Sequence, residues 1–353
     1  MDGTSRATIR DVAARAGVSV ATVSKVLNNR YGVAKPTFAR VQSAITELGY
    51  SASLSAQSLR NSRTDVVGVL LGDIESFNVQ LLKGVADGVR GTGFELIVYS
   101  AVRGSPDERV GWERQALARL SGTLIGGAVI VTPTIVGELH GAPIVAVDPH
   151  AVDPHAGPVT FPTVDCDNFR GGELATRHLL ELGHRRIAML TGRADLQSAQ
   201  LRERGYRVAL AAAGVPVDEK LIEVGAYDAA TAAEGARRLL RRRPRPTAIF
   251  ASNDVSALST VEVARSLGIG VPDKLSLVGF DNVPESALST PPLTTVEQPI
   301  TAMGQRAVEL LLQLIRGETP KQTHIRLDVR LIVRESTAPV RGSRTDESRL
   351  RTG

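Results

Sequence analysis

The residues best suited to binding another molecule lie between Thr8 and Asn28. In this segment, apolar side chains recur at helical spacing in two short runs. Gly17 separates the runs, so the pattern predicts two helices joined by a tight turn, an arrangement that inserts its second helix into the major groove of DNA. The outer face of that helix would present methyl, hydroxyl and ammonium groups to base edges and phosphates. The residues of this outer face are Val20, Ala21, Thr22, Ser24 and Lys25.

Local capping signals support both helices. Thr8 can cap the first helix, and Asp11 three residues later completes a capping box. Gly17 stands where a chain leaving a helix commonly needs a left-handed residue, and Ser19 can cap the second helix. A generic helical hairpin is the alternative interpretation of this pattern.

The excess positive charge lies in the same part of the chain. Residues 1–63 hold nine basic and three acidic side chains, a net charge of +6, whereas the remaining 290 residues have a net charge of −1. Because the neutralisation of phosphates provides the sequence-independent part of DNA affinity, a DNA-binding module should be basic. A generic hairpin does not explain why charge and pattern coincide, so the sequence favours DNA binding.

The rest of the chain is organised differently. A third helix is predicted from Pro36 to Leu48, and a Ser-rich linker follows it. Beyond Arg63, apolar strands alternate with helices, which predicts parallel α/β sheets, and the span is long enough for two lobes with a ligand cleft between them. The expected strands are 65–71, 94–99, 127–131, 143–147, 186–190, 248–251 and 275–280, and the expected helices are 81–91, 169–182 and 201–213.

Composition argues against several classes of protein. The single cysteine, Cys166, rules out an intramolecular disulfide and a cysteine-rich metal site, and His140, His150 and His155 lack the spacing of a helical zinc pair. Since no nucleophile–base or phosphate-loop pattern is present, we expect no enzyme activity, metal or cofactor. Polar residues follow Met1, and no apolar stretch approaches the roughly 20 residues that span a bilayer, so we expect a cytoplasmic protein without a membrane anchor.

Several motifs together point to a known family. The N-terminal ones are Asp11-Val12-Ala13, Ala16-Gly17-Val18-Ser19, Thr22-Val23-Ser24, Asn28, Glu47-Leu48-Gly49-Tyr50 and Ala56-Gln57-Ser58-Leu59. Those of the core are Glu181-Leu182-Gly183-His184, Asn253-Asp254, Val278-Gly279-Phe280-Asp281-Asn282 and Leu331-Ile332-Val333-Arg334-Glu335-Ser336-Thr337. With these motifs, residues 8–338 resemble the LacI/GalR family of bacterial transcriptional repressors. In that family the core is a dimerising, periplasmic-binding-protein-like fold with two lobes joined by three crossing segments.

The resemblance implies that a homodimer binds a near-palindromic operator in double-stranded DNA. In the family, the linker folds into a hinge helix on the operator, and a leucine at the position of Leu59 wedges into the minor groove. Two departures are Ala52, where proline is common, and Ala34, where a polar cap is usual; Ala52 leaves the entry to the hinge less restrained. Lys25 offers the one strong polar contact at the base-reading positions, preferentially to guanine. The implied DNA-binding residues are Thr8, Ser19, Val20, Ala21, Thr22, Ser24, Lys25, Asn28, Tyr50, Ala56 and Leu59.

The resemblance also implies a small-molecule effector. Arg202 matches a family arginine that binds ligand hydroxyl or carboxyl groups, Asp281 matches an acid that accepts hydrogen bonds from a sugar or purine, and Asp148 matches an acid at the lip of the cleft. Carboxylates and a guanidinium suit an array of hydroxyls, so a sugar or sugar derivative is expected. The implied effector-binding residues are Asp148, Arg202, Asn253, Asp254, Asp281, Phe77 and Tyr227.

Some alternatives remain open for these residues. Asn253 and Asp254 follow an apolar strand and could cap a helix as well as bind a ligand. The loop at residues 73–78 is one residue shorter than in the family, so Ser76, Phe77 and Asn78 are alternative ligand contacts.

The sequence therefore predicts a helix-turn-helix DNA-binding domain at 1–51, a hinge helix or linker at 52–63, a two-lobed effector-binding and dimerisation domain at 64–338, and a disordered tail at 339–353. The expected function is a ligand-responsive, sequence-specific transcriptional repressor. The alternative is a solute-binding protein or a carbohydrate-modifying enzyme on the same two lobes. A secreted binding protein would need a signal peptide where this chain has a basic helix-turn-helix. The arginine-rich run 237–243 is interpreted as the end of a helix.

Overall fold

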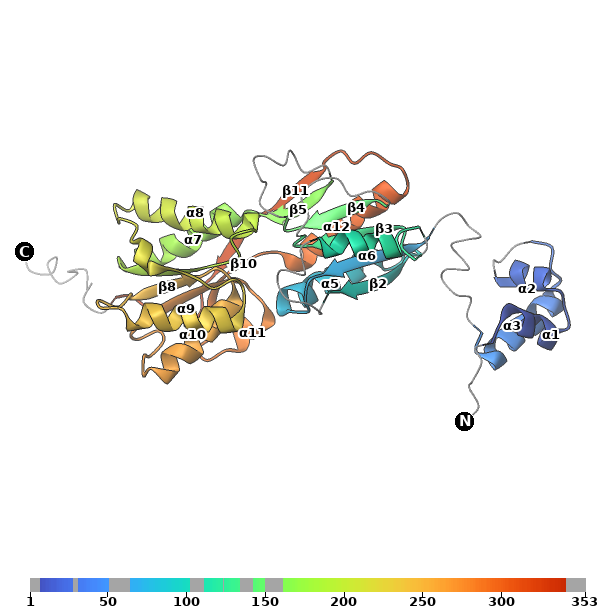
Figure 1. The fold of residues 1–353 in the computed structure, drawn as a ribbon, viewed down its shortest axis with the longest axis horizontal. Helices are drawn as coiled ribbons and strands as arrows, with labels where there is room; N and C mark the ends of the chain where they lie inside the picture. Colours follow the sequence, from blue (N-terminus) through green and yellow to red (C-terminus); the bar gives the residue numbers. More distant parts are fainter. Residues whose placement is uncertain are drawn as a thin grey trace, which may run out of the picture. The chain divides into compact units, whose positions relative to one another are not determined.

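The computed structural model describes residues 7–27, 31–50, 64–101, 111–122, 124–133, 142–149 and 161–340, which form two compact units (Figure 1). The smaller unit contains three helices, α1 (Ile9–Ala16), α2 (Val20–Leu27) and α3 (Lys35–Leu48). The larger unit contains two six-stranded sheets with their helices. The predicted fold class, an all-α N-terminal part followed by a two-lobed α/β core with parallel sheets, is confirmed.

The three helices of the smaller unit begin and end at the expected signals. The Thr8 amide donates to Asp11 Oδ2 at 2.8 Å and the Thr8 side chain accepts from the Asp11 amide, which forms the predicted capping box. Gly17 ends α1 with a φ of +63°, and Ser19 Oγ accepts from the Thr22 amide at 3.2 Å. Ala34, before α3, makes no side-chain cap. The helices pack around a small core of Val12, Ala13, Ala16, Val23, Val26, Val41 and Ala44.

Each lobe of the larger unit is built on one sheet. The strands of the first sheet are all parallel, in the order β11-β5-β4-β3-β1-β2. The second sheet has the order β12-β10-β9-β8-β6-β7, with only β12 antiparallel. The first-sheet strands are β1 (Val66–Leu71), β2 (Glu95–Ser100), β3 (Gly127–Val131), β4 (Ile144–Val147), β5 (Thr163–Cys166) and β11 (His324–Leu327). Those of the second sheet are β6 (Ile187–Thr191), β7 (Ile222–Val224), β8 (Ala248–Ala251), β9 (Ser276–Asp281), β10 (Thr294–Glu297) and β12 (Arg330–Ile332).

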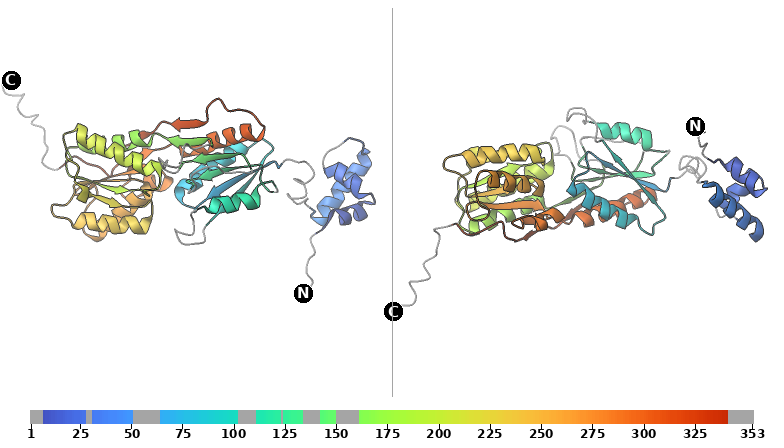
Figure 2. Two further views of the ribbon diagram at one scale, coloured as in Figure 1. Left: turned by 45° about the horizontal axis from the view of Figure 1, so that its top comes forward. Right: turned by 90° about the horizontal axis from the view of Figure 1, so that it is seen from below.

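Helices cover the faces of both sheets (Figure 2). In the first lobe they are α5 (Ser76–Val89), α6 (Trp112–Leu120) and α12 (Ile300–Ile315), and in the second lobe α7 (Asn168–Glu181), α8 (Gln197–Ala212), α9 (Ala229–Arg241), α10 (Asp254–Ser266) and α11 (Pro284–Leu288). Two of them begin earlier than the sequence indicated, α5 at Ser76 rather than Leu81 and α8 at Gln197 rather than Leu201. Polar residues alternate with apolar ones at the start of both helices, so the helical spacing of apolar residues is recognisable only further along each helix.

The chain passes between the two lobes three times. It crosses between β5 and α7, between β10 and α12, and between β11 and β12. Each crossing is short, because α7 begins two residues after β5 and α12 begins three residues after β10. The expected arrangement of two lobes joined by three crossing segments is therefore confirmed.

The helix that follows each of the first two crossings lies unusually close to a neighbour. In the second lobe, a Cβ at Gly172 of α7 would lie 2.2 Å from the backbone oxygen of Arg202 in α8, and one at Gly205 would lie 2.3 Å from the backbone oxygen of Phe169. In the first lobe, Gly84 of α5 and Gly304 of α12 make contacts of the same kind, with the backbone oxygens of Thr301 and Leu81. Glycine thus sets the spacing of both helix pairs.

We predict that Gly172→Ala destabilises the second lobe. The added methyl has no room beside the Arg202 backbone, and overpacking of this kind costs on the order of 1–3 kcal/mol. Urea unfolding followed by far-UV circular dichroism measures the loss. Gly270→Ala is the control, since its Cβ would meet Asp273 Cβ at an ordinary 3.6 Å. Equal stabilities of the two variants would contradict the role of the close approach.

Candidate functional site

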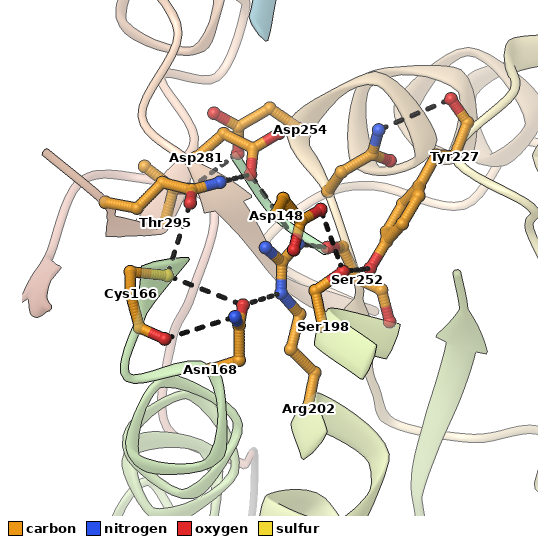
Figure 3. A network of polar contacts seen from close by, with 12 residues as sticks. Asp148, Cys166, Asn168, Ser198, Arg202, Tyr227, Ser252, Asp254, Asp281 and Thr295 are labelled. Carbon is orange, nitrogen blue, oxygen red and sulfur yellow. Dashed lines mark hydrogen bonds and ion pairs between the residues drawn. The ribbon is translucent and has the colours of Figure 1, made fainter. Parts of the chain in front are cut away.

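Polar side chains gather at the carboxyl ends of the parallel strands, where α/β sheets present their ligand-binding loops. Asp148 follows β4 of the first lobe, Ser252 follows β8 of the second lobe, and Asp281 ends β9. Tyr227 follows β7, and Arg202 reaches the same place from α8. Figure 3 shows these side chains converging on one network of polar contacts.

The backbone is strained at the same strand ends. The φ angle is +51° at Asp148, +62° at Tyr227 and +115° at Asp281. For residues with a Cβ such conformations cost about 1–3 kcal/mol each, and they persist only where the surrounding structure holds them. Thr132 and Asn282, at neighbouring strand ends, also have positive φ. Because strained residues of this kind cluster at ligand sites, the backbone marks the same region as the side chains do.

Arg202 lies at the centre of the network and is only 3% exposed. Its Nε donates to Asn168 Oδ1 at 2.8 Å, and its Nη1 donates to the backbone oxygen of Ser252 at 2.5 Å. Nη1 also lies 3.6 Å from Asp281 Oδ1, which makes a buried ion pair. The guanidinium carbon lies 3.6 Å from the centre of the Phe280 ring, within the range of a cation–π contact. These contacts fix the guanidinium in one orientation.

The network includes residues of two crossing segments. Asn168 is the first residue of α7, and Gln298 lies just before α12. Gln298 Nε2 donates to Asp281 Oδ1 at 2.5 Å, and Cys166 Sγ donates to Gln298 Oε1 at 3.2 Å. Asn168 Nδ2 completes a ring of contacts by donating to the backbone oxygen of Cys166 at 3.2 Å. Arg202 and Asp281 are therefore bonded directly to the segments that connect the lobes.

Asp148 brings the first lobe into contact with the same network. Ser198 of α8 donates from Oγ to Asp148 Oδ2 at 3.1 Å, and the Ser198 hydroxyl also lies 3.3 Å from the Tyr227 hydroxyl. A second hydrogen bond between the lobes runs from Ser76 Oγ of α5 to Glu285 Oε1 of α11 at 2.9 Å. Both bonds join the lobes away from the crossing segments.

Burial shifts the ionisation of these groups. It raises the pKa of Asp281 to about 7, although Arg202 and the Gln298 hydrogen bond act in the opposite direction. The pKa of Asp148 is raised for the same reason, against the opposing effects of Arg202 and the Ser198 hydroxyl. Burial also raises the pKa of Tyr227 to about 12, so its hydroxyl keeps its proton at neutral pH.

Asn253 and Asp254 have contacts within the fold. Asn253 caps α10, because its Oδ1 accepts from the Ser256 amide at 2.9 Å, which confirms the capping interpretation. Asp254 is fully buried and accepts from Thr295 Oγ1 at 2.6 Å and from the Val283 amide at 2.9 Å. Its carboxylate thus holds the loop that follows Asp281, rather than meeting the ring of contacts around Arg202.

The first-lobe loop at residues 73–78 separates its three candidate residues. Asn78 is buried, and its Nδ2 donates to Asp73 Oδ1 at 2.6 Å, so it braces the loop. Phe77 packs against the hydrophobic core. Ser76 reaches the second lobe through its bond to Glu285. The structure therefore directs Ser76 toward the space between the lobes.

Five residues of the network were not identified as site residues from the sequence; one is Cys166, which stood out only as the single cysteine. Asn168, Ser198, Ser252 and Gln298 belong to no motif with a chemical pattern of its own. Asn168 and Gln298 follow strands of only four residues, β5 and β10, which mix polar with apolar side chains. Ser252 directly precedes Asn253 at the end of an apolar strand. This position is the one feature of the sequence that could have identified it as a site residue.

In the smaller unit, the surface of α2 agrees with the predicted outer face. Val20, Ala21 and Lys25 are exposed, whereas Thr22 and Ser24 are half-buried. Ser19 and Thr8 are exposed at the starts of their helices, and Tyr50 packs against the small core. Asn28, Ala56 and Leu59 lie outside the described residues, as do Ala52, the predicted hinge at 52–63 and the histidines His140, His150 and His155.

Comparisons with known proteins match both units. The family model of bacterial regulatory proteins of the lacI family matches residues 8–53, and that of the periplasmic binding protein-like domain matches residues 176–337. The HTH-type transcriptional regulator CelR of Thermobifida fusca is 34% identical over 351 residues, covering 95% of this chain and all of the relative. The chain belongs to the LacI family.

Other members of the LacI family are similar over nearly the whole chain. The regulator DegA of Bacillus subtilis is 34% identical, covering 95% of this chain and 99% of the relative. A solved complex of CelR with cellobiose aligns with a TM-score of 0.69 at 32% identity, covering 94% of this chain and all of that chain. A lac repressor dimer bound to operator and an anti-inducer aligns with a TM-score of 0.79 at 26% identity, covering 95% of this chain and all of that chain. These relatives are transcriptional regulators rather than enzymes.

Two other kinds of feature are absent from the described residues of this LacI-family chain. No helix there is long and apolar enough to cross a membrane. Within the same residues, no group of three or more histidine, cysteine, aspartate or glutamate side chains could hold a metal ion.

The raised pKa of Asp281 predicts a pH dependence of stability. Between about pH 4, where an unfolded aspartate titrates, and about pH 7, the folded protein keeps a proton that the unfolded chain has released. The folded state then binds more protons than the unfolded state, so the free energy of unfolding falls as the pH rises through this window. Asp281→Asn, which cannot ionise, should reduce this slope.

Urea unfolding at several pH values from 4.5 to 7.5 measures the effect. Asp87→Asn is the control, because Asp87 lies on the exposed surface of α5 beside Arg90. We expect the control to keep the slope of the parent protein. An Asp281→Asn variant with the same slope as the parent would mean that Asp281 is already ionised below this range.

Proposed function

We propose that this LacI-family protein is a ligand-responsive transcriptional repressor that binds a near-palindromic operator as a homodimer in the cytoplasm. A small molecule, a sugar or sugar derivative, switches its affinity for DNA. The observation that carries this proposal is the buried network in which Arg202 and Asp281, from the second lobe, meet Asp148 from the first. The cellobiose complex of CelR and the operator complex of the lac repressor support it by similarity.

The proposed effector contacts come from both lobes. Arg202 and Asp281 offer a guanidinium and a carboxyl that can bind ligand hydroxyls, and Asp148 adds a second carboxyl from across the lobes. Tyr227 offers a ring and a protonated hydroxyl next to Ser198. Asn253 and Asp254 would act by holding the strand ends and the loop after Asp281.

The same contacts suggest how occupancy would reach the DNA. A ligand that engages Arg202 and Asp281 acts on groups that are hydrogen-bonded to Asn168 and Gln298 in the crossing segments. A difference in affinity for two arrangements of the lobes would then shift the equilibrium between them. We propose that residues 52–63 form a hinge whose pairing on DNA depends on that equilibrium, with Leu59 as the minor-groove wedge. The proposed domains are 1–51, 52–63 and 64–338; of the predicted tail at 339–353, residues 341–353 lie outside the described residues.

For DNA recognition, we predict that Lys25→Ala weakens operator binding by about 1–3 kcal/mol, since one direct base contact is lost. Discrimination at the guanine that Lys25 reads should relax as well. Fluorescence anisotropy at fixed salt, with an operator selected from random-sequence DNA, measures both effects. Lys83→Ala on α5 of the core is the control and should bind as the parent protein does. Unchanged operator discrimination in Lys25→Ala would remove Lys25 from the base-reading set.

For the effector, we predict that Arg202→Ala weakens binding at least tenfold, because a charged hydrogen bond contributes about 1.5–3 kcal/mol. The probe is cellobiose, followed by other neutral sugars, and calorimetry measures the affinity. Arg207→Ala is the matched control on the same helix, where Arg207 pairs with Glu203 and Glu219. Asp281→Asn provides a second variant if loss of Arg202 unfolds the lobe. Full sugar affinity in both site variants would refute the proposed site.

A further inference from the structure

We propose that Glu297 is a positioning residue that couples the effector site around Asp281 to the third crossing between the lobes, residues 328–329. The inference rests on the proposed function, because it concerns the route by which ligand occupancy would reach that crossing. The first two crossings contact the site directly, through Asn168 and Gln298. The third crossing is joined to the site by a chain of three side chains with Glu297 in the middle.

The second sheet places Glu297 between the two features that it would connect. Glu297, the last residue of β10, is paired with Asp281 on the neighbouring strand β9 and with Arg330 on β12, at its other side. Asp281 ends β9 at the effector site, and Arg330 is the first residue after the third crossing. The three residues therefore form one row across the sheet, which leads from the site to the crossing.

Both oxygens of the Glu297 carboxylate are engaged. Oε1 accepts from Asn282 Nδ2 at 3.0 Å, and Oε2 accepts from Arg330 Nε. The hydrogen bond from Arg330 lowers the pKa of Glu297, against the smaller opposing effect of burial, so the carboxylate is charged at neutral pH. A charged acceptor strengthens both hydrogen bonds. Glu297 thus holds the loop after β9 and the start of β12 together.

Asn282 fixes the end of this link that lies at the effector site. It follows Asp281 directly in the chain and has a φ of +58°, a conformation that asparagine tolerates better than most residues. Its Oδ1 accepts from Arg334 Nη2 at 2.6 Å, so both ends of its amide group are engaged. A ligand that displaces Asp281 therefore also displaces a side chain that is bonded to Glu297.

The third crossing is held on its first-lobe side as well. Arg326 of β11 donates to Asp165 of β5 from Nε at 3.2 Å and from Nη2 at 3.0 Å, and the two residues are paired in the first sheet. With Arg330 held by Glu297, only residues 328–329 lie free of the two strands. A connection of two residues has little slack, so a displacement of Arg330 is passed on to the first lobe.

The first test needs no ligand. Hydrogen–deuterium exchange of the full-length protein, read by mass spectrometry, follows the amides of residues 327–332 in two variants. Glu297→Gln keeps an acceptor for Asn282 but loses the ion pair with Arg330. Asn282→Asp keeps an acceptor for Arg334 and tolerates the positive φ, but it no longer donates to Glu297. Exchange at 327–332 should rise about twofold or more in both variants.

Arg306→Gln is the matched control for exchange, because it breaks an exposed ion pair with Glu309 on α12. Its exchange at 327–332 should equal that of the parent protein. Unchanged exchange in Glu297→Gln would show that the ion pair does not hold the crossing. Unchanged exchange in Asn282→Asp would show that the loop at the effector site does not reach it. Either result would overturn the inference.

The second test measures the coupling itself. Fluorescence anisotropy gives the operator affinity of the full-length protein with and without cellobiose, with an operator selected from random-sequence DNA. Arg330→Met should bring the factor by which the sugar changes this affinity about two- to fivefold closer to one, since an exposed ion pair contributes modestly. Arg330→Lys keeps a charge for Glu297 and should restore most of the factor. A factor in Arg330→Met equal to that of the parent would overturn the inference.

A double variant tests whether the two bonds of Glu297 act as one link. Asn282→Asp combined with Arg330→Met should change the factor no more than Arg330→Met alone, because both substitutions interrupt the same connection. Additive effects would mean two separate routes and would overturn the role of Glu297. If cellobiose and other neutral sugars leave the operator affinity of the parent unchanged, the proposed sugar effector fails, and the exchange test then decides the role of Glu297.

Discussion

Where α7 crosses α8, the backbone of Gly172 lies against the backbone oxygen of Arg202, and a single methyl group would separate the helices. This contact decides where the Arg202 side chain begins. From there the guanidinium reaches Asn168 at the start of α7 and Asp281 at the end of β9. The place of Arg202 in the network, and its hydrogen bond to the crossing segment at Asn168, depend on that short distance between two helices.

A guanidinium that is 3% exposed would be costly without partners, because leaving water costs a buried ion several kcal/mol. The structure offsets this cost with several acceptors rather than with one strong pair. Asp281 is one of them, and it is shared between Arg202 and the amide of Gln298. A ligand that exchanges any of these bonds changes the contacts of a crossing segment as well, and this is the physical basis for coupling ligand occupancy to the arrangement of the lobes.

Much of the fold could be predicted from the sequence, because its signals are local. The capping box at Thr8, the left-handed Gly17 and the long apolar strands each follow from neighbouring residues. Short strands were harder, since the three or four residues of β5, β7, β10, β11 and β12 are too few to establish a period. The sequence predicts helix α5 only from Leu81, five residues after it begins at Ser76, because Ser76, Asn78 and Gln80 interrupt the apolar residues at its start.

The sequence by itself determined the two kinds of domain, the likeness to the LacI family, and the importance of Arg202, Asp281 and Asp148 as candidates. Only the tertiary structure decided that Asn168, Ser198, Ser252 and Gln298 join them, that Asp254 supports a loop, and that Ser76 reaches the other lobe. The reason is physical. A motif records what a residue is and which residues adjoin it, whereas these contacts join side chains that are tens to hundreds of residues apart.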